Sequence, residues 1–401
     1  MKKNNKKNVI WLHSHFLYWM GGTKFIHQVI GELKKHKQVN KIYVVVENTS
    51  GFTARKFKEL GVELISLNSL TSNSLLYWLF FPIFLILDMV RVNSLIREKK
   101  LDKQQLTVYS SMFPMNVVAK FLGAKHVQNC YEPFAFFYDQ DFVSNFSLLK
   151  RVFIKILAVI YSPLDKWATR GADKLLTLNK TTQTMIAEVY GVESIKTQAG
   201  VNAELFKPYL STKIKKKYKG HPAVIHSTDY SPVKGTDRVI RAFALAAKDN
   251  LSAKLLITTT IDDPKQQRPY LELAKKLGIA DRVEFLGFLP IEELPQYYTL
   301  ARAMIQGAFS EKSGTTSMSL PVKEAMCCET PAIRPDVGGE DVVDGKTGFL
   351  VDPRDERLLA SKISLLLNDA ELSKKMGKQA RKDIISRYNW QAVTKVFAQQ
   401  L

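Results

Sequence analysis

The feature of this sequence that most restricts its fold is an alternation of short apolar strands and helices, which occurs twice along 401 residues. In the first half, strands are predicted at residues 9–13, 41–47, 61–65, 107–111, 125–130 and, as the last of that half, 174–178. In the second half they are predicted at residues 223–227, 254–260, 282–286 and 303–306, with helices at 236–248 and 294–301. Apolar strands that alternate with helices are typical of parallel sheets with helical crossovers. The sequence therefore predicts two α/β domains.

Charge and cysteine content restrict the partners and the compartment. The formal net charge is +20, which favours nucleotide phosphates, nucleic acid or an acidic membrane surface as partners. The basic segments lack interleaved aromatic residues of the kind that stack on bases, so nucleic acid is not expected. Cys130, Cys327 and Cys328 form no disulfide framework and no metal-binding spacing, which indicates a reducing cytoplasm.

Two long apolar stretches raise the question of a membrane. Residues 75–87 are apolar but contain Pro82, and residues 152–164 are interrupted by Lys155. Both are shorter than the roughly 20 residues that span a bilayer. The sequence predicts that both are buried core helices, with partial burial in a membrane interface as the alternative. No signal-peptide pattern follows the basic N-terminus, so a cytoplasmic chain is expected, peripheral at the inner face of the membrane.

Residues 308–353 contain the clearest candidate for a ligand site. A loop rich in Gly, Ser and Thr, residues 313–319, leads into a helix that is predicted to begin near Pro321. The free N–H groups and the dipole at such a helix start favour an anion. Glu324, one turn further on, can accept hydrogen bonds from hydroxyls. A ligand that carries phosphates and sugar hydroxyls would suit both features, and an ordinary loop–helix junction remains the alternative.

Several motifs resemble the GT-B glycosyltransferases of family 4. Residues 200–208, GVNAELFKP, are similar to the G-V-D-x-x-x-F-x-P signature between the two halves of that family. Val233-Lys234-Gly235 resembles its phosphate-binding lysine, and Tyr388-Asn389-Trp390 its F-S-W before the final helix. The block that starts at Glu324 and continues through residues 330–351 resembles its donor site.

The resemblance implies two Rossmann-like domains whose parallel sheets face across a cleft. Residues 1–205, with a C-terminal helix at about 385–401, would form the acceptor domain, and residues 206–384 the nucleotide-sugar donor domain. The basic run at residues 213–219 is predicted to be the linker between them. The family transfers sugar with retention of configuration and without a metal or another cofactor. The implied partners are a nucleotide sugar and a glycan or lipid-linked acceptor.

The resemblance also implies roles for individual residues. Lys234 would stabilise the charge that a diphosphate leaving group gains in the transition state. Glu324 would hold the ribose hydroxyls, and Gly21 and Gly22, at the start of a helix predicted over residues 20–36, would border the phosphates. The remaining predicted donor contacts come from the loop before the helix, through Thr316, Ser317, Met318, Ser319 and Leu320.

Three positions depart from the family pattern. Thr316 stands where the family has a glutamate, Asp229 where it has an arginine, and Tyr131 where it has a histidine. Glu311 is the candidate that replaces the missing glutamate. The predicted catalytic residues are therefore Lys234, Glu311 and Tyr131.

The competing hypotheses concern activity and metals. A weakened paralogue that binds nucleotide sugar or glycan and supports a partner enzyme is the alternative to an active transferase, whereas no acid/base set for an epimerase is present. The acidic pairs in residues 139–141 and 262–263 imitate a metal-binding D-x-D, but hard cations need further ligands, so no metal is expected. His13, His15 and His226 are expected to be structural.

Overall fold

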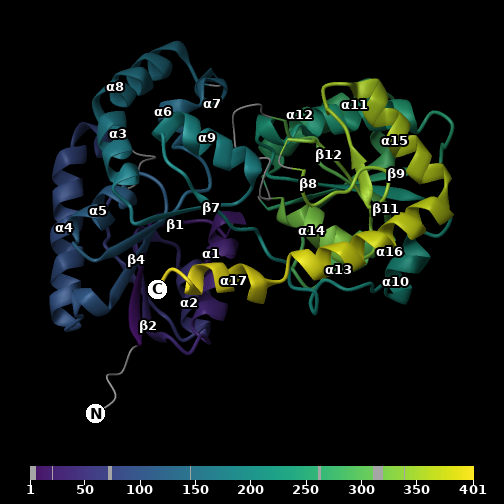
Figure 1. The fold of residues 1–401 in the computed structure, drawn as a ribbon. Coiled ribbons are helices and arrows are strands. Elements are labelled where there is room, and N and C mark those ends of the chain that lie inside the picture. The colour runs from purple at the N-terminus through teal and green to yellow at the C-terminus, as the bar shows by residue number, and fades with distance from the viewer. Residues whose placement is uncertain are drawn as a thin grey trace. The chain divides into compact units, whose positions relative to one another are not determined.

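The computed structural model describes residues 6–19, 21–70, 75–144, 146–260, 263–309, 319–337 and 339–401, which form two compact units (Figure 1). The first unit consists of the described residues up to Ala199 together with Trp390–Leu401. The second consists of the described residues from Gly200 to Asn389. The chain thus leaves the first unit a few residues before the expected border at 205 and returns to it a few residues after 385.

The first unit is built on a seven-stranded parallel sheet of order β3-β2-β1-β4-β5-β6-β7. Its strands are β1 (Lys7–Phe16), β2 (Val39–Thr49), β3 (Glu63–Ser66), β4 (Leu106–Ser110), β5 (Lys125–Asn129), β6 (Lys174–Thr177) and β7 (Ile195–Lys196). The prediction that residues 174–178 form the last strand is wrong, because Leu176 pairs with Ile195 of β7. A two-residue strand carries no apolar run that the sequence could reveal.

Helices cover this sheet, and the last of them returns from the far end of the chain. They are α1 (Gly21–Leu33), α2 (Gly51–Glu59), α3 (Leu75–Leu79), α4 (Phe81–Glu98), α5 (Met115–Phe121), α6 (Ala135–Tyr138), α7 (Gln140–Ser144), α8 (Leu148–Arg170), α9 (Lys180–Tyr190), α17 (Trp390–Ala398) and the 3-10 turn η1 (Lys103–Gln105). On α17, Phe397 packs beside Trp11, Phe25 and Tyr109, and its carbonyl accepts a hydrogen bond from the Tyr109 hydroxyl at 2.7 Å.

The second unit repeats the strand order with six parallel strands, β10-β9-β8-β11-β12-β13. They are β8 (Ala223–Thr228), β9 (Lys254–Thr259), β10 (Val283–Phe288), β11 (Ala301–Ile305), β12 (Ala332–Arg334) and β13 (Gly348–Leu350). Its helices are α10 (Thr212–Lys217), α11 (Thr236–Ala246), α12 (Pro264–Lys276), α13 (Leu294–Leu300), α14 (Leu320–Cys327), α15 (Glu356–Asn368) and α16 (Ala370–Arg387), with 3-10 turns η2 (Pro232–Lys234) and η3 (Ala280–Arg282). The prediction of two α/β domains with parallel sheets is confirmed.

The basic run at residues 213–219 is not a linker, and that prediction is wrong. It forms α10 and the residues after it, inside the second unit. Ile214 and Tyr218 lie one turn apart and are both buried in the core, while the lysines point outward. The Tyr218 hydroxyl donates to Glu284 of β10 at 2.9 Å. The high lysine content concealed an apolar anchor with helical spacing.

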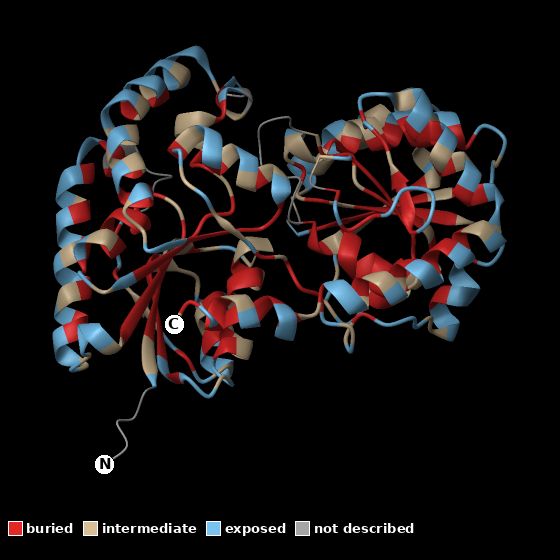
Figure 2. Cartoon of the chain, viewed as in Figure 1, coloured by how far each residue is buried: buried red, intermediate tan, exposed pale blue. Residues whose placement is uncertain are grey.

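The two apolar stretches form helices whose inner sides alone are buried. Residues 75–87 run through α3 into α4, and residues 152–164 lie within α8. Phe81, Leu85, Ile154 and Leu157 are in the core, but the outer sides of α4 and α8 are exposed over much of their length (Figure 2). Of the described helices, none is both long and apolar enough to cross a membrane. The expectation of buried core helices therefore holds for one side of each.

Candidate functional site

The site of the second unit forms where the order of strands along the sheet reverses, between β8 and β11. Loops that leave the carboxyl ends of two such strands hold the ligand in open α/β sheets. Here the loop after β8 contains η2 and Gly235, and the loop after β11 contains Gly307. Gly235 adopts a left-handed conformation (φ 62°), and a Cβ on it would lie 2.0 Å from the Gly307 carbonyl oxygen. The two loops therefore meet backbone to backbone, and only glycine fits at their contact.

A buried chain of hydrogen bonds ties these two loops together through His226 of β8. The Tyr230 backbone N–H donates to the Thr228 hydroxyl at 2.9 Å, and the hydroxyls of Thr228 and Thr236 lie 2.8 Å apart. His226 Nε2 is 3.1 Å from the Thr236 hydroxyl, and Nδ1 is 2.9 Å from the Ile305 carbonyl. Because a carbonyl can only accept, Nδ1 carries the proton and Nε2 accepts from Thr236. This series of hydrogen bonds fixes the loop after β8 to the end of β11.

His226 is neutral in this position. Burial lowers its pKa to about 4, and its hydrogen bond to Ile305 only partly opposes that shift. The neutral ring is the form that donates with one nitrogen and accepts with the other, which the chain of hydrogen bonds requires. The expectation that His226 is structural agrees with this geometry, since its two nitrogens are occupied by Ile305 and Thr236.

Lys234 ends η2 and projects at this point with about a third of its side chain exposed. Its Nζ lies 3.8 Å from the nearer carboxylate oxygen of Asp229. Asp229 is also held in place, because its carboxylate accepts from the Ser231 backbone N–H at 3.0 Å and from the Ser231 hydroxyl at 2.5 Å. The residue that stands in place of the family's arginine thus points toward the lysine rather than away from it.

The helix that was predicted to begin near Pro321 is α14, and its start carries further candidate residues. Ser319 is the N-cap residue without a side-chain cap, and Pro321 occupies the first turn, so the first N–H groups are not capped by Ser319. Glu324 is buried, and the Tyr298 hydroxyl of α13 donates to its carboxylate at 3.2 Å. Burial, and then the charge of Glu324, raises the pKa of Tyr298 well above its ordinary value, so the phenol remains a donor.

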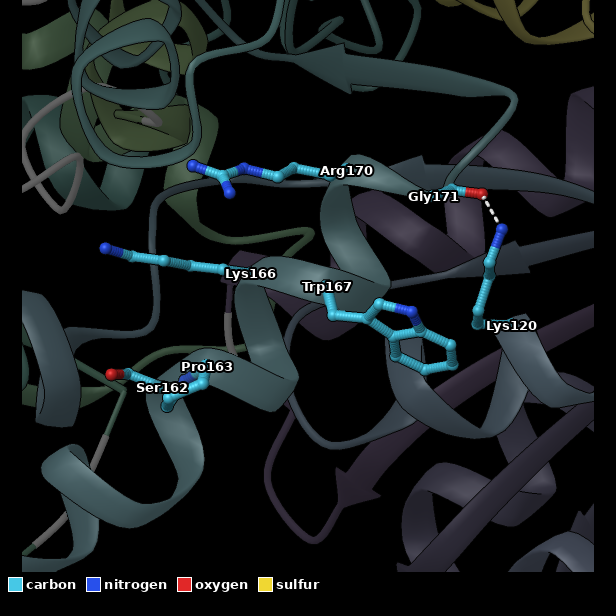
Figure 3. A pocket seen from close by; sticks show the side chains of 7 residues that line it. All are labelled: Lys120, Ser162, Pro163, Lys166, Trp167, Arg170 and Gly171. Carbon is cyan, nitrogen blue, oxygen red and sulfur yellow. Dashed lines mark hydrogen bonds between the residues drawn. The ribbon is translucent and has the colours of Figure 1, made fainter.

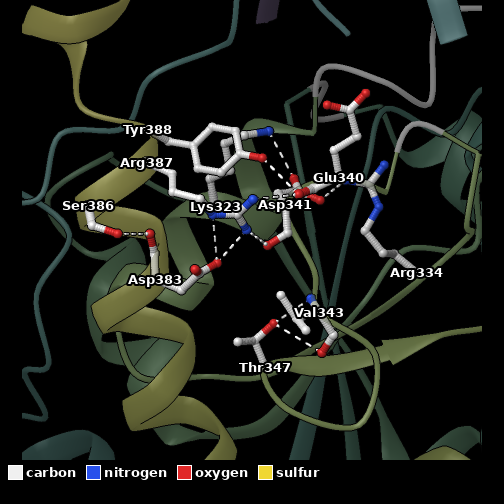
Figure 4. Close-up of polar contacts among 10 residues, drawn as sticks. All are labelled: Lys323, Arg334, Glu340, Asp341, Val343, Thr347, Asp383, Ser386, Arg387 and Tyr388. Carbon is white, nitrogen blue, oxygen red and sulfur yellow. Dashed lines mark hydrogen bonds and ion pairs between the residues drawn. The ribbon is translucent and has the colours of Figure 1, made fainter. Parts of the chain in front are cut away.

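A buried cluster of charges fixes α14 to the segment after β12 (Figure 4). Lys323 and Arg334 donate to the two carboxylate oxygens of Asp341 at 2.9 and 2.5 Å, and all three side chains are buried. Burial alone would raise the pKa of Asp341, but the two cations outweigh it and hold that pKa below the ordinary value. Tyr388 covers the cluster, with Lys323 Nζ 5.2 Å from its ring centre. The next residue along α14 is Glu324, so the cluster also sets the position of that carboxylate.

In the first unit, the predicted glycines lie at the start of α1. Gly21 is the first residue of that helix, and a Cβ built on Gly22 would meet, outside its own helix, no atom of the described residues within 4 Å. The open space at Gly22 is consistent with close approach of a ligand, whereas a packing role for this glycine would require a neighbour.

Tyr131 follows β5 in a buried, apolar position. Its ring lies edge-on to Phe25 of α1, with 5.6 Å between ring centres. Burial raises the pKa of its hydroxyl well above the ordinary value, and Asn129 opposes the shift only partly. The phenol therefore stays protonated near neutral pH and can donate but cannot act as a base. His13 and His15 lie near the end of β1, where burial and then the charge of His15 lower the pKa of His13 to about 3.

Of the acidic residues that imitate a metal site, Asp139 and Asp263 each accept a hydrogen bond at the start of a helix. The Asp139 carboxylate accepts from the Phe142 backbone N–H at 2.9 Å at the start of α7, and Asp263 accepts from the Lys265 N–H at 2.9 Å at the start of α12. Within the described ranges, no group of three His, Cys, Asp or Glu residues is arranged to hold a metal ion. Asp262 lies outside those ranges.

Four predicted site residues, Glu311, Thr316, Ser317 and Met318, lie outside the described residues. The structure brings Lys234, Gly235 and Gly307 together, and it places Ser319, Leu320 and Glu324 on one helix. The sequence analysis missed the series of hydrogen bonds through Thr236 and the cluster of Lys323, Arg334 and Asp341. A polar residue inside an apolar segment could have revealed each of them: His226 in AVIHST and Lys323 in LPVKEAM.

Comparison with known proteins identifies this architecture. Over 98% of the chain, the structure is similar to a glycosyltransferase from Rickettsia africae (TM-score 0.76, 16% identity, 97% of that chain). It is also similar to Anabaena Alr3699/HepE in complex with UDP-glucose (TM-score 0.73, 17% identity, 98% of both chains). These likenesses define the fold as GT-B.

Sequence comparison then relates the second unit to a known family. Residues 210–383 match the family described as "Glycosyl transferases group 1". Over 183 residues, the chain is 34% identical to N-acetyl-alpha-D-glucosaminyl L-malate synthase of Bacillus anthracis. The aligned residues make up 44% of this chain and 45% of that protein. The chain spans about half the length of such curated relatives. The chain thus has the GT-B fold, and most of its second unit matches the group 1 glycosyltransferase family.

Proposed function

We propose that the chain is a retaining glycosyltransferase that moves a hexose-type sugar from a nucleotide diphosphate to a glycan or lipid-linked acceptor of the cell envelope. The acceptor would bind to the first unit and the donor to the second. The reaction would need no metal and no cofactor. The enzyme would work in the cytoplasm, at the inner face of the membrane.

The observation that carries this proposal is the position of Lys234 at the strand reversal of the second unit. The loops that hold Gly235 and Gly307 leave the carboxyl ends of β8 and β11, where open α/β sheets bind nucleotides. A fixed ammonium group there stabilises a diphosphate leaving group more as its charge develops than in the bound donor. Anabaena Alr3699/HepE, which shares the fold, is known in complex with UDP-glucose, and this supports a nucleotide sugar as donor.

The other predicted residues would complete the donor site. Glu324, held by Tyr298, has one turn of α14 between it and the uncapped helix start, so it can accept from ribose hydroxyls while the helix start faces phosphate. Glu311, Thr316, Ser317 and Met318 would contribute from the loop before α14. Tyr131 would act as a hydrogen-bond donor at the acceptor side.

A weakened paralogue that binds nucleotide sugar or glycan and supports a partner enzyme is the second candidate. The observation in its favour is the distance of 3.8 Å between Lys234 and Asp229. A carboxylate beside the lysine offsets part of the positive charge that a diphosphate would meet. Donor binding without turnover would favour this candidate.

The experiment is a panel of UDP- and GDP-sugars tested for transfer, for hydrolysis and, by calorimetry, for binding. Loss of the charged contact in Lys234→Ala is expected to weaken donor binding by roughly tenfold or more, since a hydrogen bond to a charged group contributes about 1.5–3 kcal/mol. Lys248→Ala, at an exposed lysine beyond the end of α11, is the matched control and should bind normally.

A second variant is expected to have the opposite effect on donor binding. Asp229→Asn removes the competing carboxylate and is expected to tighten donor binding a few-fold, an effect that added salt should reduce. If no sugar nucleotide binds, or if Lys234→Ala binds as well as the wild type, the assignment of the donor site is wrong.

A further inference from the structure

The outer side of α8 is apolar, although it faces away from the core of the first unit. Six exposed side chains recur at helical spacing along it: Leu149, Val152, Ile156, Val159, Ile160 and Trp167. Leu149 is 85% exposed and Val159 is 77% exposed, while Ile154, Leu157 and Ala168 on the opposite side are buried. A helix that packs by one side ordinarily exposes polar residues on the other. The outer side of α8 therefore has the composition of a surface that is covered in use.

Neighbouring helices extend this apolar surface. Ile83, Ile86 and Val90 form the exposed side of the first turns of α4, and each is more than half exposed. Phe81 of α4 contacts Tyr161 of α8 with 4.7 Å between ring centres. On the other flank, the exposed Phe121 at the end of α5 lies 5.2 Å from Trp167. The outer side of α8 together with these neighbours is called the α8 surface below.

The charges on α8 that are not buried are of one sign. The helix carries Lys150, Arg151, Lys155, Lys166 and Arg170, and its one carboxylate, Asp165, is buried on the inner side. An apolar strip flanked by cations, with no exposed carboxylate on that helix, is complementary to a surface that is apolar inside and anionic at its edge. A protein partner of ordinary composition would offer polar groups, but the aliphatic side chains of this strip, which are all of its members except Trp167, cannot form hydrogen bonds.

A cavity of about 560 Å³ adjoins the C-terminal end of the strip (Figure 3). Lys166 and Arg170, one turn apart on α8, extend side by side along it, while Trp167 turns toward Lys120. Lys120 Nζ donates to the Gly171 carbonyl at 2.5 Å, and Arg170 Nε to the Tyr190 carbonyl at 2.7 Å, so both cations are held in position. Cations beside an exposed tryptophan are the combination found at membrane interfaces, where phosphates and acyl chains meet.

We propose that the α8 surface docks on a membrane that contains anionic phospholipid. The helix lies in the plane of the interface, with its apolar strip at the boundary between headgroups and acyl chains. A headgroup phosphate binds at the cavity beside Lys166 and Arg170. The inference extends the proposed location of the enzyme, and docking requires neither donor nor acceptor, so its test is independent of transferase activity.

The test is co-sedimentation of the full chain with vesicles of phosphatidylcholine alone and of phosphatidylcholine mixed with phosphatidylglycerol. Binding is expected to the mixed vesicles. The double variant Ile156→Glu/Val159→Glu should weaken it by about tenfold or more, because two apolar contacts are lost and two negative charges face the lipid. The control is Leu251→Glu in the second unit, since Leu251 is exposed to the same 77% as Val159 but lies outside the α8 surface. Circular dichroism verifies that each variant is folded.

A second pair of variants tests the headgroup contact. Lys166→Gln/Arg170→Gln should lower binding to the mixed vesicles by about thirtyfold, at about 1 kcal/mol for each cation, and leave weak binding to phosphatidylcholine unchanged. Wild-type binding by Ile156→Glu/Val159→Glu, or an equal loss in Leu251→Glu, would overturn the proposal. So would selective release by inorganic phosphate at constant ionic strength, which indicates a site for free phosphate. Self-association that Val159→Glu abolishes without vesicles would assign the surface to a second copy of the chain instead.

Discussion

Asp165 in the first unit and Asp341 in the second are both buried carboxylates, but their surroundings differ in charge. Asp165 accepts from Asn116 at 2.8 Å and from the hydroxyls of Tyr138 and Tyr190 at 2.9 Å, all of them neutral donors. Asp341 lies between the cations of Lys323 and Arg334. One unit thus buries a carboxylate among neutral groups, and the other buries it within an ion cluster.

The difference predicts opposite responses to pH. Burial raises the pKa of Asp165 despite its three donors, so its contribution to stability is present below the ordinary value of 3.8 and is lost as pH rises through the folded pKa. The pKa of Asp341 is lowered, so its contribution is present above 3.8 and is lost as pH falls through the folded pKa. Near neutral pH, the second unit therefore depends on its buried carboxylate more than the first unit does.

The two units can be followed separately, because all five tryptophans belong to the first: Trp11, Trp19, Trp78, Trp167 and Trp390. Tryptophan fluorescence reports the first unit alone, whereas far-ultraviolet circular dichroism reports both. A variant that weakens the second unit should separate the two unfolding curves in urea, and a variant in the first unit should move the fluorescence curve itself.

The largest effect is expected from Asp341→Asn. The change removes the carboxylate charge that both buried cations contact, which costs about 3–5 kcal/mol in the free energy of unfolding of the second unit. Circular dichroism should then show an early transition that fluorescence does not follow. Asp383→Asn, in the separate and partly exposed ion pair with Arg387 (Figure 4), is the control and should cost less than about 1 kcal/mol. Coincident, unshifted curves for Asp341→Asn would contradict the proposed role of the ion cluster.

A smaller effect, with a pH dependence, is expected from His226→Gln. The folded pKa of about 4 lies below the ordinary 6.5, so the wild type loses this contribution as pH falls through that interval. The stability difference between wild type and variant should shrink by about 2 kcal/mol from pH 6.5 to 5, at about 1.4 kcal/mol per pH unit. The measurement is urea unfolding by circular dichroism at both pH values. His221→Gln, at an exposed histidine of the same unit, is the matched control.

The smallest of the three effects is expected from Asp165→Asn. The amide oxygen can still accept from part of the donor set, and no charge is left buried, so the cost at neutral pH should be about 1–2 kcal/mol. Because the wild type gains stability as Asp165 becomes protonated, the cost should rise as pH falls. Fluorescence-detected urea unfolding measures it. A loss as large as that of Asp341→Asn would remove the proposed contrast between the two units.

Much of the fold was predictable because its elements bury apolar residues with a regular period. The inner side of α11, with Val239, Ile240, Phe243 and Ala246, was predicted from helical spacing and is buried. The main strands were predicted in the same way. The short strands β7, β12 and β13 were not, because two or three residues carry no period. The helix α10 was missed because its lysines outnumber its buried residues.

The site was predictable where it depends on local sequence. Glu324 was expected one turn into a helix and lies in α14, whereas Lys234 and Gly235, which were singled out by a motif, lie in the loop after β8. What could not be predicted depends on groups brought together by the sheet. The side chain of Lys323 meets that of Asp341, and His226 meets Ile305, across long separations in sequence. The contact between Asp229 and Lys234 depends on how the intervening turn folds, which spacing alone does not determine.

The position of α17 has a consequence for the order in which the chain folds during synthesis. Phe397 of this helix covers Trp11, Phe25 and Tyr109, although it is separated from them in the chain by the whole of the second unit. On the ribosome, the second unit can complete its core before the first is finished. Until α17 has been synthesised, these aromatic side chains of the first unit remain uncovered. Premature termination just before α17 would therefore damage the unit that is translated first.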